Sequence, residues 1–480
     1  MKKGDILQCK IEKTEFPNKG IFHIEDRRGS IKGVIPGQTV RFRAKKVRKD
    51  RLEGTLMEIV EKSPLEDRIP ACPHFGVCGG CAYQTLSYEN QKKVKEGQVR
   101  SLLENVVEDL PWEGIKESPV DFGYRNKMEF SFGDERKDGP LALGLHKKNS
   151  FYDIVQIIDC KIVREAYNQI VNSVVTFFSE RKIPYYKKRS HEGYLRHLVV
   201  RSSIKTGNIL INLVTSSQME VDLQPLVQQL IKLPINGKIV GILHTINDSM
   251  ADVVKKDDMH LLYGQDYFYE YLLDLKFKIS PFSFFQTNTL GAEVLYETAR
   301  DFIGDIDDKI VFDLYSGTGT IGQMMAAVAK KVIGVEIVEE AVEAAKENAA
   351  MNGIDNCEFI AGDVLKVVDT LDMKPDVIVL DPPRDGIHPK AIGKIIGFGA
   401  KEILYISCKP TSLVRDLEDF LEAGYRVERA CAVDMFPQNP NVETVVLLSQ
   451  QKSDDTIEVD LDLDELDITA AEKKATYREI

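Results

Sequence analysis

A cysteine at the end of an apolar run is the residue in this sequence best suited to covalent chemistry. Cys408 follows the strand-like stretch 402–406 and precedes Pro410, so we expect it at the mouth of a strand and not in a core. A thiolate in that position can add to an electron-poor carbon and later leave. Three other cysteines are predicted to be small core hydrophobes: Cys9, Cys357 and Cys431.

A glycine-rich turn predicts a cofactor pocket in the same part of the chain. The apolar run 310–314 leads into the turn at 316–320, where glycine lets the backbone pass close to a ligand. Acidic residues follow the next three strand-like runs. The positions predicted to bind the cofactor are Gly317, Thr320, Glu336, Asp363 and Asp381. Carboxylates at the ends of successive parallel strands share one crevice, which is the arrangement of S-adenosylmethionine-dependent methyltransferases. Each of them could instead cap the following helix.

The residues around the two prolines after Asp381 indicate which atom is methylated. Enzymes that methylate amino groups usually carry an aromatic residue there, whereas this chain has Arg384. A nearby thiol favours carbon 5 of uracil, because that carbon becomes nucleophilic only after a group such as the Cys408 thiolate adds to carbon 6. Carbon 5 must then lose a proton. Glu443, just before the apolar run 445–448, is predicted to be the base that takes it.

Three cysteines within ten residues predict a metal or iron–sulfur site. Cys72, Cys78 and Cys81 are separated by glycines that let the chain wrap around a compact group. With a distant fourth ligand, such thiolates hold either zinc or a four-iron cluster. His74 would favour zinc if it were a ligand. Unliganded core thiols are the remaining alternative.

The elements that must position these residues alternate between strands and helices from about residue 290 onward. This alternation predicts an α/β fold, a doubly wound Rossmann-like class I methyltransferase domain. The predicted strands cover residues 309–314, 331–336, 357–360, 377–380 and 402–406.

The N-terminal region has a different rhythm and a basic charge. Short β-rich runs at 6–11, 20–24, 39–46 and 51–60 predict a small closed β-barrel. Residues 1–62 carry a net charge of +7, which suits RNA phosphates, although an ordinary solvated face explains it equally well. A helix is predicted at 88–104. Basic and apolar residues alternate over 195–201, which predicts cations on one face that either contact phosphates or belong to a plain amphipathic edge strand.

The composition predicts a soluble protein that stays in the cytoplasm. The 480 residues are 43% hydrophobic, enough for several packed domains. No apolar run approaches the roughly 20 residues of a membrane span, and the N-terminus lacks the apolar stretch of a signal peptide. Residues 451–480 carry a net charge of −6 and are predicted to be a disordered tail.

The ordered set of motifs resembles the RNA (uracil-5-)-methyltransferase family, in its 23S rRNA branch with an N-terminal TRAM domain and a [4Fe-4S] cluster. The matching stretches are residues 284–288, 313–317, 381–384, 407–408 and 442–443. The resemblance implies that four residues hold S-adenosyl-L-methionine: Gln286, Tyr315, Glu336 and Asp381. It implies Cys408 as nucleophile and Glu443 as proton acceptor. It also implies Cys160 as the fourth ligand of the [4Fe-4S] cluster.

The resemblance also predicts the domain organisation and the substrate. The expected regions are a TRAM-like RNA-binding barrel at 1–62, a central RNA-binding region with the cysteine cluster at 63–280, a methyltransferase domain at 281–450 and the tail. The expected target is a uridine in a loop or bulge of 23S rRNA, because the tRNA branch typically lacks the N-terminal barrel. Uracil 54 of tRNA is the alternative. A non-catalytic iron–sulfur RNA-binding factor and methylation of cytosine or an exocyclic nitrogen are further hypotheses. We expect a monomer with no membrane partner.

Overall fold

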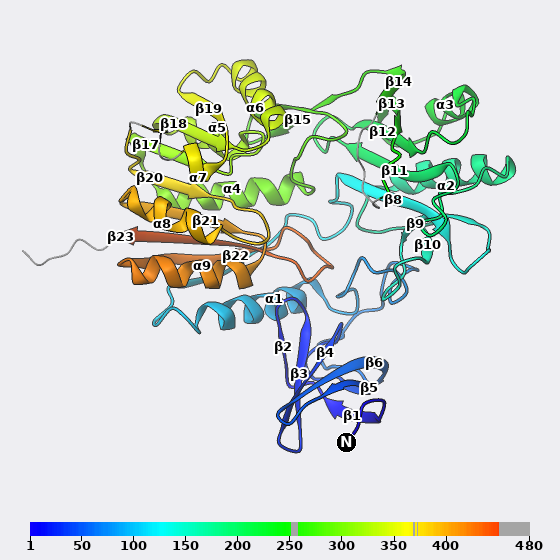
Figure 1. Ribbon diagram of the computed structural model, residues 1–480, viewed down its shortest axis with the longest axis horizontal. Coiled ribbons are helices and arrows are strands. Elements are labelled where there is room, and N and C mark those ends of the chain that lie inside the picture. Colours follow the sequence, from blue (N-terminus) through cyan, green and yellow to red (C-terminus); the bar gives the residue numbers. More distant parts are fainter. Residues whose placement is uncertain (251–257, 368–369, 372, 451–480) are drawn as a thin grey trace, which may run out of the picture.

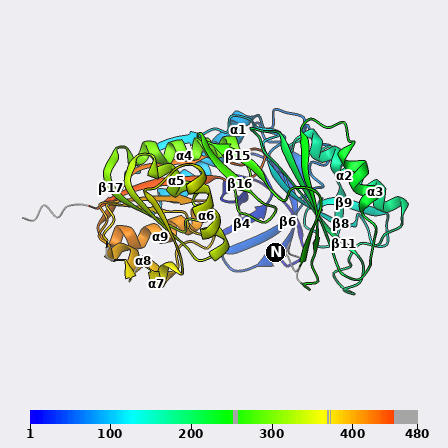
Figure 2. The same cartoon turned by 90° about the horizontal axis from the view of Figure 1, so that it is seen from above.

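The computed structural model describes residues 1–250, 258–367, 370–371 and 373–450; the predicted disorder of the acidic tail falls outside these residues. Three large sheets make up the molecule (Figure 1). The C-terminal and central sheets lie side by side (Figure 2), and the N-terminal sheet lies below them in the view of Figure 1. Helix α1 (Tyr88–Leu103) contacts strand β2 (Lys13–Glu15) of the N-terminal sheet. It also contacts strand β7 (Trp112–Lys116) and helix α9 (Pro410–Glu422) of the C-terminal region. Within the described ranges, no helix combines the length and apolarity needed to cross a bilayer.

The N-terminal sheet curls because its two outer strands are joined. Its order is β1-β5-β6-β4-β3-β2, and only residues 11 and 12 separate β1 from β2. Ile11 N donates to Gln38 O at 2.8 Å, and Glu12 N donates to Ile21 O at 2.9 Å, so this short link pairs with both sides. The sheet is thus a curled half-barrel. The prediction of a closed barrel was wrong to that extent, because β1 and β2 are edge strands that follow one another along the chain and pair with β5 and β3. Its strands are β1 (Ile6–Lys10), β2 (Lys13–Glu15), β3 (Lys19–Ile24), β4 (Arg27–Lys32), β5 (Thr39–Val47) and β6 (Arg51–Glu61).

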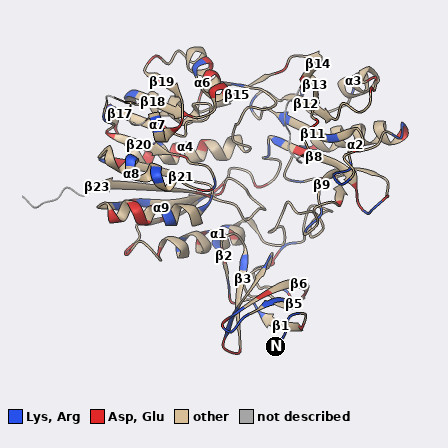
Figure 3. Cartoon of the chain, viewed as in Figure 1, with Lys and Arg blue, Asp and Glu red and all other residues tan. Residues whose placement is uncertain are grey.

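Alternation along β5 places apolar side chains inside this sheet and cations outside. Val40, Phe42 and Ala44 are buried, whereas Arg41 and Arg43 are exposed. Figure 3 shows Lys and Arg on these strands, with Asp and Glu beside them. Several cations form ion pairs: Arg28–Glu15 at 2.6 Å, Arg41–Glu58 at 2.8 Å and Lys46–Glu53 at 3.2 Å. Part of the positive charge is therefore neutralised within the sheet.

The central sheet has seven strands in the order β10-β9-β8-β11-β12-β13-β14. Its neighbours are antiparallel except for β12 and β13. Helices α2 (Glu165–Glu180) and α3 (Gln224–Ile231) share its hydrophobic core. Its strands are β8 (Lys127–Asp134), β9 (Leu141–His146), β10 (Ile154–Gln156), β11 (Leu195–Ser202), β12 (Asn208–Thr215), β13 (Lys238–Ile246) and β14 (Asp258–Gly264).

Strand β11 lies at the centre of this sheet, and every one of its residues is buried. Arg201, which is 2% exposed, donates to Ser280 O at 2.7 Å and to Ser283 O at 2.6 Å. Arg196 donates to Asn247 O at 2.7 Å. The prediction that these cations line an exposed face was therefore wrong. The strand is covered on both sides, and each guanidinium satisfies carbonyl oxygens of neighbouring turns instead.

The C-terminal sheet has eight strands in the order β19-β18-β17-β20-β21-β23-β22-β7. The strands are β7 (Trp112–Lys116), β17 (Ile306–Leu314), β18 (Ala329–Glu336), β19 (Cys357–Ala361), β20 (Val377–Leu380), β21 (Glu402–Ser407), β22 (Tyr425–Val433) and β23 (Glu443–Gln450). The helices of this region are α4 (Thr289–Ile303), α5 (Thr320–Ala326), α6 (Glu339–Met351), α7 (Val364–Val367), α8 (Pro389–Gly397) and α9 (Pro410–Glu422).

The five strands predicted from the sequence are confirmed as β17 to β21, which pair in parallel. Helices α4 and α5 share a hydrophobic core with one face of the sheet, and α8 and α9 share another with the opposite face. The chain moves from β17 outward to β19 and then returns to β20 on the other side. This is the predicted Rossmann-like α/β fold, and its topological switch point lies between β17 and β20.

Two segments from the first 280 residues complete this region. Strand β7 pairs in parallel with β22, with Trp112 opposite Ala430. The hairpin of β15 (Phe268–Leu272) and β16 (Leu275–Ile279) places Leu272 and Phe277 in the same core as Leu295 of α4. The C-terminal sheet and its core therefore extend beyond the range 281–450.

Candidate active site

The glycine-rich turn lies at the carboxyl end of β17, at the switch point. Tyr315, Gly317 and Gly319 adopt left-handed backbone conformations, with φ of 71°, 55° and 73°. A Cβ on Gly319 would lie 2.5 Å from Phe359 Cζ, so the turn reaches β19 only because this residue is glycine. A Cβ on Gly317 would meet nothing within 4 Å, which leaves room for a ligand over the turn. Thr320 begins α5 directly after the turn.

The carboxylates of Glu336 and Asp363 hold backbone N–H groups near this turn. Glu336 Oε2 accepts from Gly317 N at 3.0 Å, and Oε1 accepts from Val338 N at 3.0 Å. Asp363 Oδ1 accepts from Leu365 N at 3.0 Å, at the start of α7. Both side chains therefore cap local backbone, which was the alternative to cofactor binding. Each carboxylate keeps further lone pairs that can accept hydrogen bonds from a ligand.

Three carboxyl groups meet beside the turn: Asp313 of β17, Asp381 after β20 and Glu443 at the start of β23. Burial raises the pKa of Asp381 to about 7. Burial, followed by the charge of Asp381, raises the pKa of Asp313 to about 7 and that of Glu443 to about 8. A backbone hydrogen bond from Gly322 opposes the rise in the pKa of Asp313, which is fully buried. Burial in this cluster therefore favours the neutral form of the three carboxyl groups.

Cys408 follows β21 and faces the same carboxyl groups. Its thiol is half-buried, and burial together with the charges of Glu443 and Asp381 raises its pKa to about 11. Arg384 lies close enough to both Cys408 and Glu443 to oppose these shifts. The predicted nucleophile and the predicted base are thus brought together. The guanidinium of Arg384 lies near both the Cys408 thiol and the Glu443 carboxyl group, and burial makes each of these groups resist ionisation.

Helix α9 fixes the loop that carries Arg384. Ser412 Oγ donates to Arg384 O at 2.8 Å. Asp416, which is 1% exposed, accepts from Tyr405 Oη at 2.7 Å and from Ile387 N at 2.8 Å. Because Asp416 binds both β21 and the loop after β20, it sets the spacing between the two strand ends that present Cys408 and Arg384.

The segment 434–441, which leads into Glu443, is held from the N-terminal half of the chain. Lys95 Nζ of α1 donates to Asp434 Oδ1 at 2.6 Å, and neither side chain is exposed. Gln91 of the same helix exchanges two hydrogen bonds with Gln438, at 2.9 and 3.0 Å. Helix α1 therefore fixes the backbone that carries the predicted base.

The predicted cofactor residue Gln286 is held beside the carboxyl cluster. Its backbone oxygen accepts from Asn126 Nδ2 at 2.9 Å, and the same nitrogen donates to Thr289 Oγ1 at 2.9 Å. Burial raises the pKa of Tyr296 of α4, and the charge of Asp381 raises it further. A side-chain hydrogen bond with Gln286 opposes this rise. Gln286 and Tyr296 thus border the crevice from the side of α4.

The four predicted cluster ligands approach one another from two segments. Cys72, Cys78 and Cys81 lie between β6 and α1, and Cys160 follows β10. Cys72 Sγ lies 3.8 Å from Asp159 O. Burial raises the pKa of Cys160 to about 11, and the charges of Cys72 and Cys78 contribute to this shift. Nevertheless, within the described part of the chain no group of three or more His, Cys, Asp or Glu residues is spaced to hold a metal ion.

His74 has a different task from that of a zinc ligand. Its Nε2 accepts from Ile158 N at 3.1 Å and lies 3.4 Å from Asp159 N. Burial also lowers the pKa of His74, which favours the neutral ring that this acceptor role requires. The ring therefore joins the Cys72–Cys81 loop to the segment before Cys160, and its Nε2 is not available to a metal.

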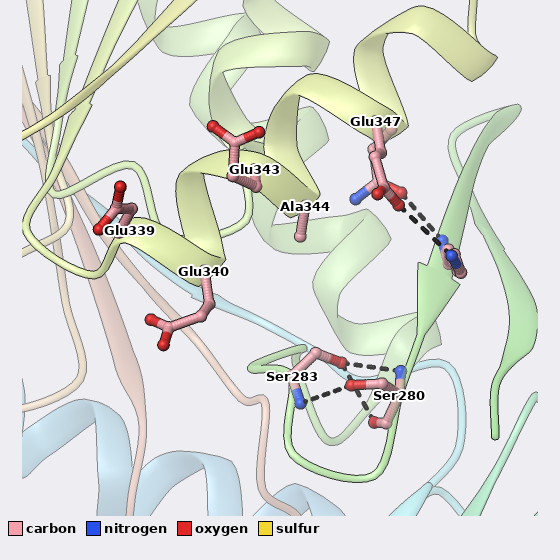
Figure 4. Close-up of a pocket in the computed structure, with 9 residues that line it drawn as sticks. Ser280, Ser283, Glu339, Glu340, Glu343, Ala344 and Glu347 are labelled. Carbon is pink, nitrogen blue, oxygen red and sulfur yellow. Dashed lines mark hydrogen bonds and ion pairs between the residues drawn. The ribbon is translucent and has the colours of Figure 1, made fainter.

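A cavity of about 460 Å³ lies next to the site, between the first turns of α6 and the 280–283 turn (Figure 4). Four glutamates of α6 line it, and none of the predicted site residues does. The lining residues are Lys278, Ser280, Ser283, Glu339, Glu340, Glu343, Ala344, Glu347 and Asn348. Carboxylates on this wall repel RNA phosphates.

Sequence reasoning missed three contributors to this site: Asp313, the role of Arg384 and the Lys95–Asp434 pair. Asp313 had a signal, since it is the single acidic residue within an otherwise apolar strand end before the glycine-rich turn. Arg384 was noticed only as the replacement of an aromatic residue. Nothing local to Lys95 or Asp434 indicates that they pair.

Comparisons with known proteins agree with this geometry. The family model described as tRNA (Uracil-5-)-methyltransferase matches residues 88–451. A protein of Caldanaerobacter subterraneus subsp. tengcongensis named an uncharacterized RNA methyltransferase is 49% identical over 94% of this chain and 100% of its own length. Another so named, from Clostridium acetobutylicum, is 50% identical over 94% of this chain and 99% of its own.

A solved structure resembles nearly the whole chain. It is the Pyrococcus abyssi tRNA (uracil-54, C5)-methyltransferase in complex with S-adenosyl-L-homocysteine, with a TM-score of 0.72 and 26% identity. The match covers 92% of this chain and 100% of that one. Because the match leaves out only 8% of this chain, it includes at least part of residues 6–61.

The raised pKa of Glu443 predicts a pH-dependent effect on stability. A carboxyl whose pKa rises on folding stabilises the fold fully only below its ordinary value, near 4.5, and this contribution is lost as pH rises through about 8. We therefore expect the difference in unfolding free energy between Glu443→Gln and wild type to shift in favour of Glu443→Gln as the pH rises from about 5 to about 9. Urea denaturation across this range measures it. Glu340→Gln, at an exposed carboxylate of α6, is the control, and parallel profiles for wild type and Glu443→Gln would contradict the prediction.

Proposed function

This chain belongs to the tRNA (uracil-5-)-methyltransferase family and is an S-adenosylmethionine-dependent RNA methyltransferase, and from this premise we propose that Cys408 acts as a covalent nucleophile in methylating uracil carbon 5. The observation that carries the proposal is the meeting of Cys408, Arg384 and Glu443 at the strand ends next to the glycine-rich turn. Carbon 5 of uracil is a poor nucleophile until a group adds to carbon 6. A thiol and a base in one crevice supply both requirements.

The reaction begins with the Cys408 thiolate. Its sulfur bonds to carbon 6, and the electrons of the 5,6 double bond move onto carbon 5 and oxygen 4 as an enolate. Carbon 5 then bonds to the sulfonium methyl group, whose bonding electrons stay on the departing sulfur and leave S-adenosylhomocysteine. Arg384 supports the first step, because its positive charge opposes the rise in the pKa of the thiol.

Glu443 completes the reaction. Its carboxylate takes the proton from carbon 5, the 5,6 double bond re-forms, and the bond between carbon 6 and sulfur breaks to release the thiolate. A base with a pKa of about 8 is well matched to this transfer near neutral pH. The buried hydrogen bonds of the 434–441 segment hold this carboxyl group at one position in the crevice.

The methyl donor is proposed to occupy the crevice at the switch point. Gly317 and Thr320 border the open space over the turn, and Tyr315 lies beside them. Bound S-adenosylmethionine supplies the electrophilic methyl group. We assign ribose hydroxyls to Glu336 and the adenine edge to Asp363. Two further residues, Gln286 and Asp381, are assigned to its amino-acid end and sulfonium side, because the carboxyl cluster favours positive charge.

We propose 23S rRNA as the substrate, with the β1–β6 barrel as a TRAM-like RNA-binding domain. The cysteine quartet and its resemblance to the ribosomal branch support this choice. Uracil 54 of tRNA is the second candidate, which the Pyrococcus abyssi structure favours because it resembles the chain nearly from end to end. The target base must leave its stack to reach Cys408, so an unpaired segment is the expected site in either RNA.

We propose a [4Fe-4S] cluster at the cysteine quartet because of the resemblance to the ribosomal branch of the family. Four thiolates suit either zinc or a four-iron cluster. His74 Nε2 accepts a hydrogen bond from backbone, which speaks against this atom as a zinc ligand. When bound, the cluster would link the two segments that carry these thiols.

Covalent chemistry at Cys408 is tested by RNA that contains 5-fluorouridine. Fluorine cannot leave as a proton does, so wild type with S-adenosylmethionine should form an adduct that survives a denaturing gel. Cys408→Ala should form none, because it lacks the sulfur. Cys9→Ala, which changes a buried thiol in the barrel, is the control and should react like wild type. An adduct with Cys408→Ala would show that another residue is the nucleophile. No adduct with wild type on either rRNA or tRNA would favour the non-catalytic binding protein.

The RNA target is identified by nucleotide analysis of a strain that lacks the protein. We expect loss of 5-methyluridine from 23S rRNA, with restoration by the wild-type chain and not by Cys408→Ala. Loss from tRNA with unchanged rRNA would establish the second candidate instead. Methylated cytosine or a methylated exocyclic nitrogen as the missing product would contradict carbon 5 chemistry altogether.

The cluster proposal predicts iron in the protein as purified without oxygen. Elemental analysis should find about four iron atoms per chain and little zinc. Cys160→Ser should lower the iron content, because it removes a ligand from the second segment. Cys431→Ser, at a buried thiol of β22, is the control for loss of a thiol alone. Zinc in place of iron, or full iron in Cys160→Ser, would overturn this assignment.

A further inference from the structure

The loop between β9 and β10 carries two exposed aromatic side chains. Phe151 is 63% exposed and Tyr152 is 49% exposed. Their rings touch edge to face, with centroids 5.3 Å apart. Two adjacent exposed rings form an apolar patch of the kind that binding surfaces use.

Cations from a second segment lie over the same rings. Lys188 Nζ lies 4.7 Å from the Phe151 ring centroid, and Arg189 Cζ lies 4.5 Å from that of Tyr152. Neither stretch of sequence, 146–152 or 185–191, contains an acidic residue. The surface therefore combines aromatic faces with concentrated positive charge, which fits a polyanion that also presents planar apolar groups.

Backbone hydrogen bonds connect this surface to the cysteine loop. Gly79 N donates to His146 O at 3.0 Å, and Lys148 N donates to Val77 O at 2.7 Å. The barrel is also adjacent, since a Cβ on Gly33 would lie 3.3 Å from Lys148 Nζ. The aromatic pair thus lies beside two regions already assigned to RNA.

The other end of the cysteine loop contacts the segment that carries the base. Asn439 Nδ2 donates to Gly80 O at 2.8 Å, and Ala82 N donates to Gln438 O at 2.8 Å. Hydrogen bonds therefore connect the loop that carries the aromatic pair to the cysteine loop, and the cysteine loop to the segment that leads into Glu443.

We propose that Phe151 and Tyr152, with Lys188 and Arg189, form a platform on which unpaired bases flanking the target uridine stack. The proposal rests on the proposed function, since it takes RNA as the substrate. Flipping a base out of its stack leaves its neighbours in need of new partners, and aromatic rings provide them. Arg189, which is exposed, holds an adjoining phosphate, and Lys188, whose Nζ is buried, supports the Phe151 ring. A protein partner fits less well, because the two rings lie beside cations.

Fluorescence anisotropy with a short labelled single-stranded RNA tests the platform. Phe151→Ala and Tyr152→Ala should each weaken binding by about 5-fold to 150-fold, the range for loss of one base–aromatic stack. Tyr152→Phe should bind like wild type because it keeps the ring. Tyr263→Ala is the matched control, since Tyr263 is 38% exposed on β14, at the opposite edge of the same sheet, and should also bind like wild type.

Two further measurements identify stacking as the cause. With RNA whose flanking nucleotides are abasic, wild type should lose the advantage it holds over the Phe151→Ala/Tyr152→Ala double variant. Arg189→Gln should reduce the slope of log affinity against log salt by about 0.7, whereas the ring variants leave it unchanged. Equal affinity of the double variant and wild type for intact RNA would overturn the proposal, as would the same loss with abasic RNA.

Methyl transfer to the same RNA is measured in parallel, so that the two proposals fail separately. Wild type that binds RNA through the rings but forms no 5-methyluridine would contradict the proposed function and support the platform. If wild type methylates the RNA and the double variant has the same affinity and KM as wild type, the proposed function is supported and the platform proposal is wrong. Unchanged circular dichroism of the double variant confirms that the exposed rings are not needed for folding.

Discussion

The buried ion pair between Lys95 and Asp434 joins helix α1 to the segment that follows β22, next to the candidate site. Its atoms are 2.6 Å apart, and neither side chain reaches solvent. A charge buried there without its partner would be strongly destabilising, so α1 and the end of β22 must meet for either one to be enclosed. Asp434 begins the segment that ends at Glu443. The position of the proposed base therefore depends on a contact between residues 339 positions apart.

The parts of the structure that the sequence predicted are those that local pattern determines. Strands β17 to β21 are short apolar runs bounded by glycine or acidic residues, and their parallel arrangement brings Asp381 and Cys408 to one edge. Long-range pairs were not predictable in this way. The sequence pattern places Lys95 at a polar position of an amphipathic helix and Arg201 on an outward face. Sequence spacing does not show that a buried carboxylate or carbonyl lies close enough to bind each of them. Asp363 is compatible with both predicted roles, helix capping and cofactor binding, since a capping carboxylate keeps acceptors for a ligand.

Charge is divided over the molecule in a way that matches two unlike ligands. The crevice beside the glycine-rich turn is lined by Asp313, Asp381 and Glu443, and the adjoining wall of α6 carries four more carboxylates. This surface favours a cationic donor and disfavours phosphate. Cations are concentrated instead on the curled N-terminal sheet and around the β9–β10 loop. RNA would thus be held at a distance from the crevice, and only a neutral base would enter it.

Strand β7 has a consequence for how the protein is made. It leaves the ribosome among the first quarter of the residues, yet its partner β22 is synthesised some 300 residues later, so β7 stays unpaired until translation is nearly complete. Such a delayed pairing raises the contact order and slows the final step of folding. It also means that a truncated chain beginning near residue 281 would expose β22 as an open edge, a template for aggregation. The catalytic half of this protein is therefore not a module that evolution or an engineer can move without its N-terminal half.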